Sequence, residues 1–341
     1  MKAIRIHKHG GLDSLNIDNI DEPLTTDNKV KVQIKAASIN HLDIWVRNGL
    51  PGINIPLPLI MGSDASGVVV SIGDGVSKFG IGDKVVVQPG TYNSNNKDVI
   101  DNKINYSSSY GILGETENGV QAEYVNLPEY NLNKMANHLS FEEAASMQLV
   151  FMTAYQMLVT RGNLLKDEFI LIYGATSGIG CAAIQIAKNL GAIIISTVGS
   201  DKKIEYAKSI GADHVLKHDV DIKDEVRSIT SGKGVNMVCE HIGKDTWKQS
   251  LSVLNKGGRI VTCGSTTGSN VSIDLRHLFM KQHTIIGSTM SCLDTFNIVM
   301  DKIQNKEFEP FIDKVYKFDD VKKAHKRMEN RKHFGKIILT P

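Results

Sequence analysis

The sequence predicts an α/β protein with two domains, a β-rich domain and a doubly wound domain built on a parallel sheet. Three observations predict this class. Short alternating strands dominate the first third of the 341 residues, strands alternate with helices in the middle of the chain, and a glycine-rich turn joins one of these strands to a helix. With 41% hydrophobic residues, the chain can bury two cores.

The β-rich part begins with residues 29–37, whose polar and apolar side chains alternate as in a half-buried strand. Residues 67–72 and 84–88 are predicted to be further strands, joined by the turn-rich segment 73–83. Residues 90–119 are polar and rich in Asn, Ser and Gly. We expect them to form a long surface excursion that contributes nothing to the core.

From residue 141 the pattern changes to helical spacing, with Ser140 and Glu143 forming a capping box at the start of the helix. Strands and helices then alternate, which specifies βαβ units and a parallel sheet. The predicted strands are 169–173, 192–198, 214–218, 235–243, 257–265 and 283–290, with helices at 177–191, 200–211 and from about 244.

The tail from about residue 290 contains a helix, a short strand, a second helix and a last strand at 336–340, with no core of its own. We therefore expect it to pack back onto the amino-terminal β-rich domain. The predicted domains are residues 1–130 together with 291–341, and residues 131–290.

Composition argues against several classes of function. The 39 basic and 37 acidic residues nearly balance, so nothing favours a nucleic-acid or membrane-surface binder. The amino terminus lacks the apolar core of a signal peptide, and no run of about 18 apolar residues follows, so we expect a soluble cytoplasmic protein. The cysteines form no CxxC pair, and we expect each to be a small buried hydrophobe: Cys181, Cys239, Cys263 and Cys292.

A glycine-rich turn marks the predicted cofactor site. The apolar strand from Phe169 to Tyr173 runs into this turn, and a helix begins at once. Missing side chains let a backbone approach a pyrophosphate, and free N–H groups at a helix start face the anion. The literal GxGxxG is absent, because Ala175 and Ser177 hold its first two glycine positions. We still predict a nicotinamide dinucleotide here, held by Gly174, Ala175, Ser177, Gly178, Ile179 and Gly180.

The end of the second strand of this domain favours NADPH. An NAD site places an acidic residue there to bind the ribose 2′-hydroxyl, and that position falls near Gly199. Ser200 and Lys203 could then donate to a 2′-phosphate. Two alternatives stay open: Lys203 lies on a solvated helix face, or Asp201 binds the ribose.

The whole chain resembles the medium-chain dehydrogenase/reductase superfamily. The segments that carry the resemblance are AASINHLDIWVRNG, LPLIMGSDASGVVVSIGDGV, GDKVVV, LSFEEAASMQLVFMTAYQML, GATSGIG, GGRIVTCGSTTG, DLRHLFMKQHTIIGS and HFGKIIL. The resemblance implies a GroES-like β domain followed by a Rossmann domain, with the active site between them. It also implies a homodimer or homotetramer, joined through edge strands near 285–290.

Positions that hold zinc in this family have changed in the chain. Asn40 stands where zinc members place a cysteine, Ser63 and Asp64 replace a His-Glu pair, and Leu149 replaces another cysteine or acid. The positions of the family's Ser/Thr–His proton relay hold Leu42 and Trp45. The four cysteines of the family's structural zinc lobe would fall at Asn93, Asn96, Val99 and Ser107. We therefore predict no metal, with a stray zinc on His41, Asp43 or Asp64 as the open alternative.

This ligand loss narrows the chemistry that the resemblance implies. Without a Lewis acid, alcohol dehydrogenation loses its main source of transition-state stabilisation. A quinone, an enone or an enoyl thioester accepts hydride with its charge delocalised and needs only hydrogen-bond donors. The Asn-x-x-Asp spacing of Asn40 and Asp43 is similar to a motif of the zinc-free quinone and enone reductases. We expect an NADPH-dependent reductase of a small conjugated acceptor, with no nucleic-acid or membrane partner.

Site roles follow from matching positions. Asn40 is expected to face the nicotinamide and the substrate carbonyl, unless its side chain only satisfies its own loop. Thr153 matches the residue that packs against the nicotinamide ring. Trp45 and Arg47 are candidate substrate contacts, with plain packing or surface charge as the alternative. Further cofactor contacts are expected at His218, Gly264, Ser265, Gly287, Ser288 and Lys336.

Two other functions remain open from the sequence. One is a zinc-type alcohol dehydrogenase with atypical ligands. The other is an NADP-binding protein without turnover, serving as a redox sensor, a nucleic-acid-binding protein or a structural protein.

Overall fold

The computed structural model describes residues 1–93, 95, 96, 99, 102–218 and 221–341. It divides into two compact units. The first contains Met1–Leu149 and Cys292–Pro341, and the second contains Val150–Ser291. The first unit therefore continues to Leu149, beyond the boundary at residue 130 that the sequence suggests.

The first unit is built around a mixed sheet that, within the described residues, has seven strands. The strands follow the order β10-β6-β5-β3-β18-β17, with β9 also paired to β3. A smaller sheet has the order β2-β1-β4, and β7 pairs with β8. The strands are β1 (Lys2–Ile6), β2 (Leu15–Asn19), β3 (Lys29–Ile39), β4 (Leu59–Ile60), β5 (Asp64–Ile72), β6 (Lys84–Val87), β7 (Gly90–Thr91), β8 (Gly111–Ile112), β9 (Tyr124–Pro128), β10 (Leu132–Lys134), β17 (Ile312–Lys317) and β18 (Lys336–Thr340).

One face of strand β3 contributes to the hydrophobic core, because its apolar side chains alternate with polar ones along the strand. Val30, Val32 and Ile34 are buried on one face, as the sequence pattern predicts. The expectation that residues 90–119 contribute no core is wrong. Leu113 belongs to the same cluster, because its N–H donates to Pro89 O (2.9 Å) and ties the returning segment to the sheet.

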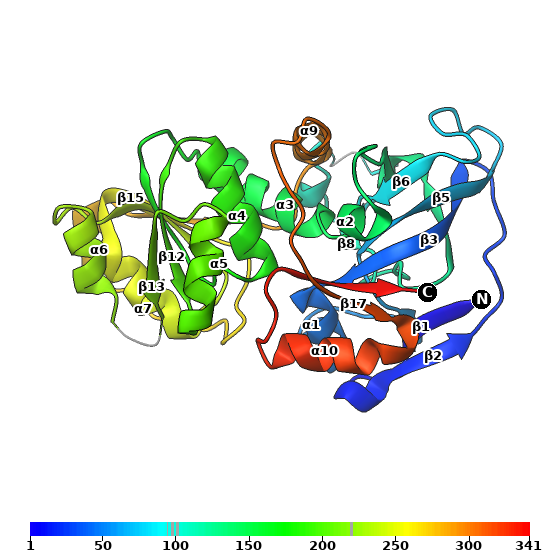
Figure 1. The fold of residues 1–341 in the computed structure, drawn as a ribbon, viewed down its shortest axis with the longest axis horizontal. Helices are drawn as coiled ribbons and strands as arrows, with labels where there is room; N and C mark the ends of the chain where they lie inside the picture. Colours follow the sequence, from blue (N-terminus) through cyan, green and yellow to red (C-terminus); the bar gives the residue numbers. More distant parts are fainter. Residues whose placement is uncertain (94, 97–98, 100–101, 219–220) are drawn as a thin grey trace. The chain divides into compact units, whose positions relative to one another are not determined.

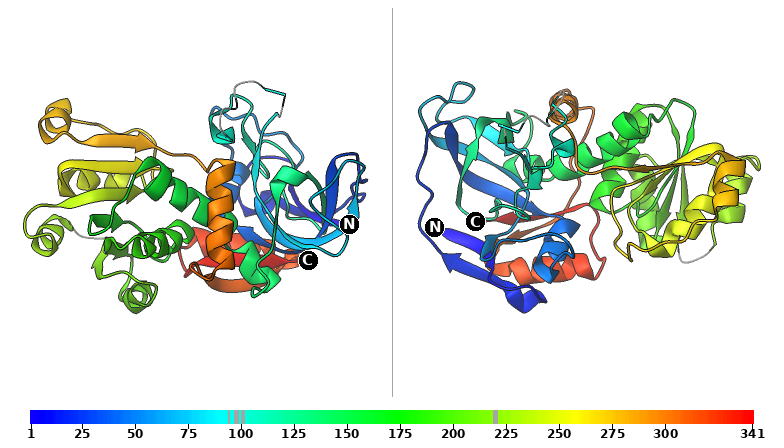
Figure 2. Two further views of the ribbon diagram at one scale, coloured as in Figure 1. Left: turned by 90° about the horizontal axis from the view of Figure 1, so that it is seen from above. Right: turned by 180° about the vertical axis from the view of Figure 1, so that it is seen from behind.

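The tail of the chain completes this unit. Strand β18 lies between β3 and β17, antiparallel to β3 and parallel to β17. Both termini lie in this unit, close together in all three ribbon views (Figures 1 and 2). The unit's helices are α1 (His41–Asn48), α2 (Phe141–Ala145), α9 (Leu293–Gln304) and α10 (Val321–Glu329).

The helix expected from residue 141 begins as predicted but is interrupted. Ser140 Oγ accepts from Glu143 N (3.2 Å) and Glu143 Oε2 accepts from Ser140 N (2.8 Å), which is the expected capping box. Helix α2 then ends, and α3 (Gln148–Tyr155) follows as a separate helix that continues into a π-helical turn, Gln156–Arg161.

The second unit is a parallel sheet with the order β13-β12-β11-β14-β15-β16. Helices α4 and α5 pack on one side of it, and α6 and α7 lie on the other (Figure 1). The strands are β11 (Phe169–Ile172), β12 (Ile193–Val198), β13 (His214–Lys217), β14 (Val235–Glu240), β15 (Leu254–Thr262) and β16 (Thr284–Gly287). The helices are α4 (Gly178–Asn189), α5 (Ile204–Ser209), α6 (Lys223–Ile229), α7 (Lys244–Val253) and α8 (Leu275–Lys281).

This arrangement is the Rossmann-type sheet that the sequence predicts, and it determines where a ligand can bind. The strand order reverses at β11, which pairs with both β12 and β14. In such sheets, ligands bind outside the carboxyl ends of the strands at this switch point. In the described ranges, no helix combines the length and apolar character that are needed to cross a bilayer.

Candidate functional site

The glycine turn after β11 has the geometry of a phosphate-binding turn. Gly174 has a φ of 64°, in the left-handed region that favours glycine. A Cβ on Gly180 would lie 2.1 Å from Gly174 O, so a side chain has no room there. The turn therefore packs tightly against the first turn of α4, although two of the motif's glycines are absent.

The start of α4 presents backbone donors. Ser177 caps the helix, and its Oγ accepts from Gly180 N at 2.9 Å. Within the described part of the chain, the N–H groups of Gly178 and Ile179 have no hydrogen-bond partner. Unpaired N–H groups at a helix N-terminus attract an anion. This cradle fits the pyrophosphate of a dinucleotide.

The end of β12 is arranged around Gly199. A Cβ at Gly199 would lie 3.1 Å from His218 Nε2, so the two predicted contacts are neighbours. Asp201, the alternative ribose ligand, pairs with Lys217, with 3.5 Å between Oδ1 and Nζ. Sequence reasoning missed Lys217, although its position at the end of a parallel strand is a usable signal. Ser200 and Lys203 flank this pair in the turn before α5.

The other predicted cofactor residues of this unit also follow strands. Gly264 and Ser265 lie beyond β15, and Gly287 and Ser288 lie at the end of β16. Ser288 Oγ is buried without a partner among the described residues. Thr153, on α3, donates to Met290 Sδ at 3.9 Å.

Two residues that the sequence did not single out lie close to these positions. Arg161 Nε donates to Gly287 O at 3.1 Å. His241, just beyond β14, has Nε2 at 2.9 Å from Tyr173 O, and its Cε1 lies 3.5 Å from the position of a Gly174 Cβ. Burial lowers the pKa of His241, which favours its neutral form beside the turn.

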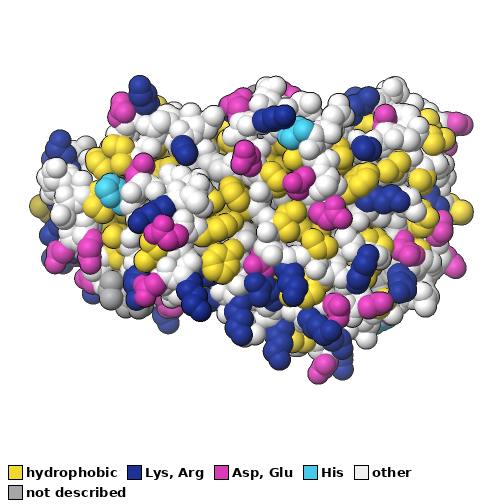
Figure 3. Space-filling model, viewed as in Figure 1, with side chains coloured by type: hydrophobic (Ala, Val, Ile, Leu, Met, Phe, Trp, Pro, Cys, Tyr) yellow, Lys and Arg dark blue, Asp and Glu magenta, His cyan; other side chains and the backbone are white. Residues whose placement is uncertain are grey.

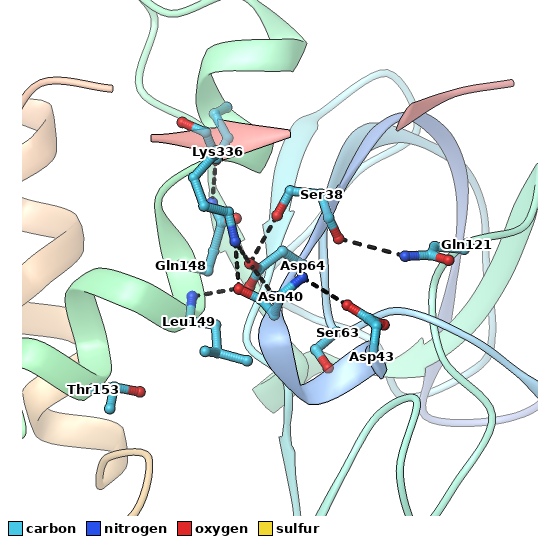
Figure 4. Close-up of polar contacts among 12 residues, drawn as sticks. Ser38, Asn40, Asp43, Ser63, Asp64, Gln121, Gln148, Leu149, Thr153 and Lys336 are labelled. Carbon is cyan, nitrogen blue, oxygen red and sulfur yellow. Dashed lines mark hydrogen bonds and ion pairs between the residues drawn. The ribbon is translucent and has the colours of Figure 1, made fainter. Parts of the chain in front are cut away.

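The first unit contains a buried polar cluster at the carboxyl end of β3. We call Ser38, Asn40, Asp64 and Lys336 the Asn40 cluster. Lys336, Asn40 and Asp64 point toward one another (Figure 4). Strand register explains the meeting, because Ser38 pairs with Asp64 on β5 and Ile39 pairs with Ile337 on β18.

The Asp64 carboxylate is the centre of this cluster. Its Oδ2 accepts from Ser38 Oγ (2.9 Å), Asn40 Nδ2 (2.8 Å) and Lys336 Nζ (3.1 Å). Its Oδ1 accepts from Leu149 N at 2.9 Å. Lys336 also donates to Asn40 Oδ1. Both ends of the Asn40 amide are therefore held by charged groups.

Asp43 lies beside this cluster and carries a perturbed carboxyl group. Its Oδ2 accepts from Asn40 N at 2.7 Å, which holds the start of α1. Burial raises the pKa of Asp43 to about 7, against the opposing effects of the Asn40 N–H and Lys336. Burial therefore favours the protonated form of Asp43.

The donor set of this region does not fit a zinc ion. Ser63 Oγ donates to Leu113 O at 2.8 Å, both oxygens of Asp64 are already used, and the Lys336 ammonium lies against Asn40 and Asp64. Catalytic zinc needs three N, S or O ligands around an open position. Among the described residues, no group of three or more His, Cys, Asp or Glu side chains could hold a metal.

Three predicted residues of this unit have other partners. Lys336, placed by the sequence among the cofactor contacts, donates to Asn40 and Asp64. Arg47, a candidate substrate contact, is 1% exposed and donates to Glu329 of α10 and to Gly10 O. This buried pairing gives Arg47 a structural role, so we do not carry it forward as a substrate contact. Trp45 is half-buried and packs edge-on against the His41 ring.

Comparison with known proteins identifies the family. Residues 26–137 match the alcohol dehydrogenase GroES-like domain, and residues 178–305 match the zinc-binding dehydrogenase domain. A quinone oxidoreductase of Salmonella typhimurium is 30% identical over 353 residues, covering 99% of each chain. The chain belongs to the medium-chain dehydrogenase/reductase superfamily. It is therefore an oxidoreductase of this superfamily, with the two-domain fold that the sequence predicts.

Other relatives show how the family varies. A crotonyl-CoA carboxylase/reductase of Cereibacter sphaeroides is 29% identical, covering 97% of this chain and 84% of its own. A crystal structure of an NAD-dependent alcohol dehydrogenase has a TM-score of 0.96 and 36% identity, covering 100% of both chains. The relatives thus include reductases and dehydrogenases, and the choice between them depends on this chain's own residues.

Proposed function

We propose that this protein is a zinc-independent, NADPH-dependent reductase that transfers hydride to a conjugated acceptor, such as a quinone, an enone or an enoyl thioester. The observation that carries the proposal is the Asn40 cluster, which offers an amide donor and an ammonium where zinc members of the family hold a metal. An acceptor whose charge is delocalised needs such donors rather than a Lewis acid.

The residues of the second unit support NADPH. The cradle formed by Gly178, Ile179 and Gly180 would hold the pyrophosphate. Gly199 stands where an NAD site would place its ribose-binding acid, and Lys203 would supply positive charge near the 2′-position. The pairing of Asp201 with Lys217 weakens it as a ribose ligand. The NAD-dependent alcohol dehydrogenase relative supports the opposite choice, so the cofactor needs a direct test.

Asn40 is the residue that we assign to the reaction. The bound nicotinamide supplies the hydride. Asn40 Nδ2 carries two hydrogens, of which Asp64 takes one. The other would donate to the acceptor oxygen as it becomes negative, which lowers the energy of the enolate or hydroquinone anion. We assign protonation of the product to solvent. Thr153 would pack beside the nicotinamide ring, and Trp45 would line the acceptor site.

The assembly that we propose is a homodimer or homotetramer joined through β16. This strand ends the sheet order, so its outer edge is unpaired within the described structure. Helix α8, before it, leaves Leu275, Phe279 and Met280 about two-thirds exposed. An open strand edge beside an apolar helix is a favourable surface for pairing with a second copy.

A screen of NADPH and NADH oxidation over quinones, enones and enoyl thioesters tests the proposal. We expect turnover with NADPH in protein that contains less than stoichiometric zinc. The Lys203→Ala variant should raise the KM for NADPH about tenfold or more, since a charge-assisted bond contributes about 1.5–3 kcal/mol, and leave that for NADH unchanged. Lys202→Ala, at the exposed neighbouring position, is the matched control.

The same screen distinguishes the competing functions. Stoichiometric zinc with alcohol oxidation would support a zinc-type alcohol dehydrogenase, and a strong NADH preference would contradict our cofactor assignment. Binding of NADPH without turnover of any acceptor would support a sensor or nucleic-acid-binding role. Lysine and arginine side chains do gather over α10 (Figure 3), but Lys322, Lys323 and Arg327 are each paired with a carboxylate.

A further inference from the structure

The Lys336 side chain is buried, although the charged end of a lysine normally stays in water. Lys336 is the first residue of β18, and only 3% of its surface is exposed. Desolvating an ammonium costs several kcal/mol unless charged or polar partners compensate for it. Asp64 and Asn40 are those partners. The cost makes a specific role for the cation worth testing.

The ammonium determines the orientation of the Asn40 amide. An ammonium can only donate, so the atom that it contacts must be the amide oxygen, Oδ1. Nδ2 then faces Asp64, which can only accept when it is ionised. Lys336 and Asp64 therefore exclude the flipped amide by chemistry, because a flip would place N–H against ammonium and oxygen against carboxylate.

Asn40, Asp64 and Leu149, which stand at three positions that match zinc-site residues of the family, form one connected unit with Lys336, while Ser63 donates to Leu113 O. Asn40 and Asp64 contact Lys336, and Leu149 N holds the far oxygen of Asp64. This unit places a positive charge on the oxygen side of the Asn40 amide and a negative charge on its nitrogen side. The two charges together hold the amide in one orientation.

We propose that Lys336 is a positioning residue: together with Asp64 it holds the Asn40 amide in one orientation, so that the second Nδ2 hydrogen faces the oxygen of the acceptor. The proposal rests on the proposed function, since it assigns Asn40 to the same reaction. It differs from the expectation that Lys336 binds the cofactor.

A double-mutant cycle tests this role. Lys336→Met keeps an unbranched side chain as far as Cε and removes the ammonium group, Lys336→Arg keeps a charged donor, and Asn40→Ala removes the amide. We expect Lys336→Met to lower kcat about tenfold or more, with less than about a twofold change in the Kd for NADPH measured by fluorescence. Lys336→Arg should recover part of the loss. The double variant should lose no more than Asn40→Ala alone.

Other results would overturn the proposal. If the fold losses of kcat in the two single variants multiply in the double variant, Lys336 does not act through Asn40. A higher Kd for NADPH with unchanged kcat would make Lys336 a cofactor contact. If Lys336→Met fails to fold, the double variant Lys336→Met with Asp64→Asn takes its place, because it removes both charges of the buried pair. Its kcat is then compared with that of Asp64→Asn alone.

A readout without turnover separates this proposal from the proposed function. The side-chain amide signal of Asn40 is assigned in ¹⁵N-asparagine-labelled protein by its loss in Asn40→Ala. We expect Lys336→Met to shift this signal and speed its hydrogen exchange. An unchanged signal would refute the positioning role even if no acceptor is found. Failure of the wild-type screen with a shifted signal would refute only the proposed reaction.

Discussion

Replacing Asp43 by Asn should change how the stability of the protein depends on pH. Burial raises the pKa of the Asp43 carboxyl from 3.8 to about 7 in the folded state. The pKa of this carboxyl is higher in the folded chain than in the unfolded chain. Between these two pKa values, the folded chain therefore binds a proton that the unfolded chain has released. The stabilisation is therefore complete below about pH 3.8 and is lost as pH rises through about 7.

The size of the effect follows from these two pKa values. They differ by about three, and each unit corresponds to about 1.36 kcal/mol, so the wild type loses up to about 4 kcal/mol of stability through this group. The amide introduced by Asp43→Asn does not ionise, while its oxygen could still accept from Asn40 N. The free energy of unfolding of Asp43→Asn should therefore rise relative to the wild type by up to about 4 kcal/mol between pH 4 and pH 8.

Urea denaturation followed by circular dichroism at pH 4, 5, 6, 7 and 8 measures this difference. Comparing two variants at each pH cancels the titration of all groups that they share. Asp27→Asn, at an exposed position, should run parallel to the wild type. A constant difference between Asp43→Asn and the wild type would show that Asp43 ionises in the folded protein as it does in the unfolded chain, and the reasoning from burial would be wrong.

Three further changes test other parts of the structure. Gly180→Ala should raise the Kd for NADPH about tenfold or more in a fluorescence titration, because a Cβ at this position has no room. A Cβ on Gly11 meets no other atom, so the control Gly11→Ala should bind NADPH normally. Equal affinities of the two variants would contradict the tight turn. Arg47→Met should lower the free energy of unfolding by about 1–3 kcal/mol, because it removes the buried hydrogen bond to Gly10 O and the ion pair with Glu329, whose side chain is 32% exposed; an unchanged stability in urea denaturation would argue against these contacts. Phe279→Lys should convert the assembly to monomers in light scattering after size exclusion, and an unchanged mass would place the interface elsewhere.

The position of the candidate cofactor residues at one edge of the parallel sheet could largely be predicted from the sequence. Gly174, Gly199, His218 and Gly264 each follow a predicted strand, and the carboxyl ends of parallel strands share one edge of the sheet. Placing a residue after a strand is thus enough to place it at that edge. His241 obeys the same rule and was missed only because it belongs to no glycine motif.

The Asn40 cluster could not be predicted in the same way. Asn40 is separated from Lys336 by 296 positions, and the contact depends on the register between β3 and β18. A shift of one residue would move Lys336 to the other face of the sheet. Arg47 is similar, since a charged residue on a short helix normally faces solvent, and only the packing of α10 buries it.

The place of β18 within its sheet has a consequence for the synthesis of the chain. This strand is inserted between β3 and β17, yet it follows every other described strand in the order of synthesis. Until it emerges from the ribosome, β3 and β17 each present an open edge, which is a template for pairing with another chain. The second unit, whose strands are all made earlier, has its whole sheet available to form first. We therefore expect the nascent protein to depend on protection of the β3 edge, and truncation before residue 336 to cause aggregation rather than a simple loss of activity.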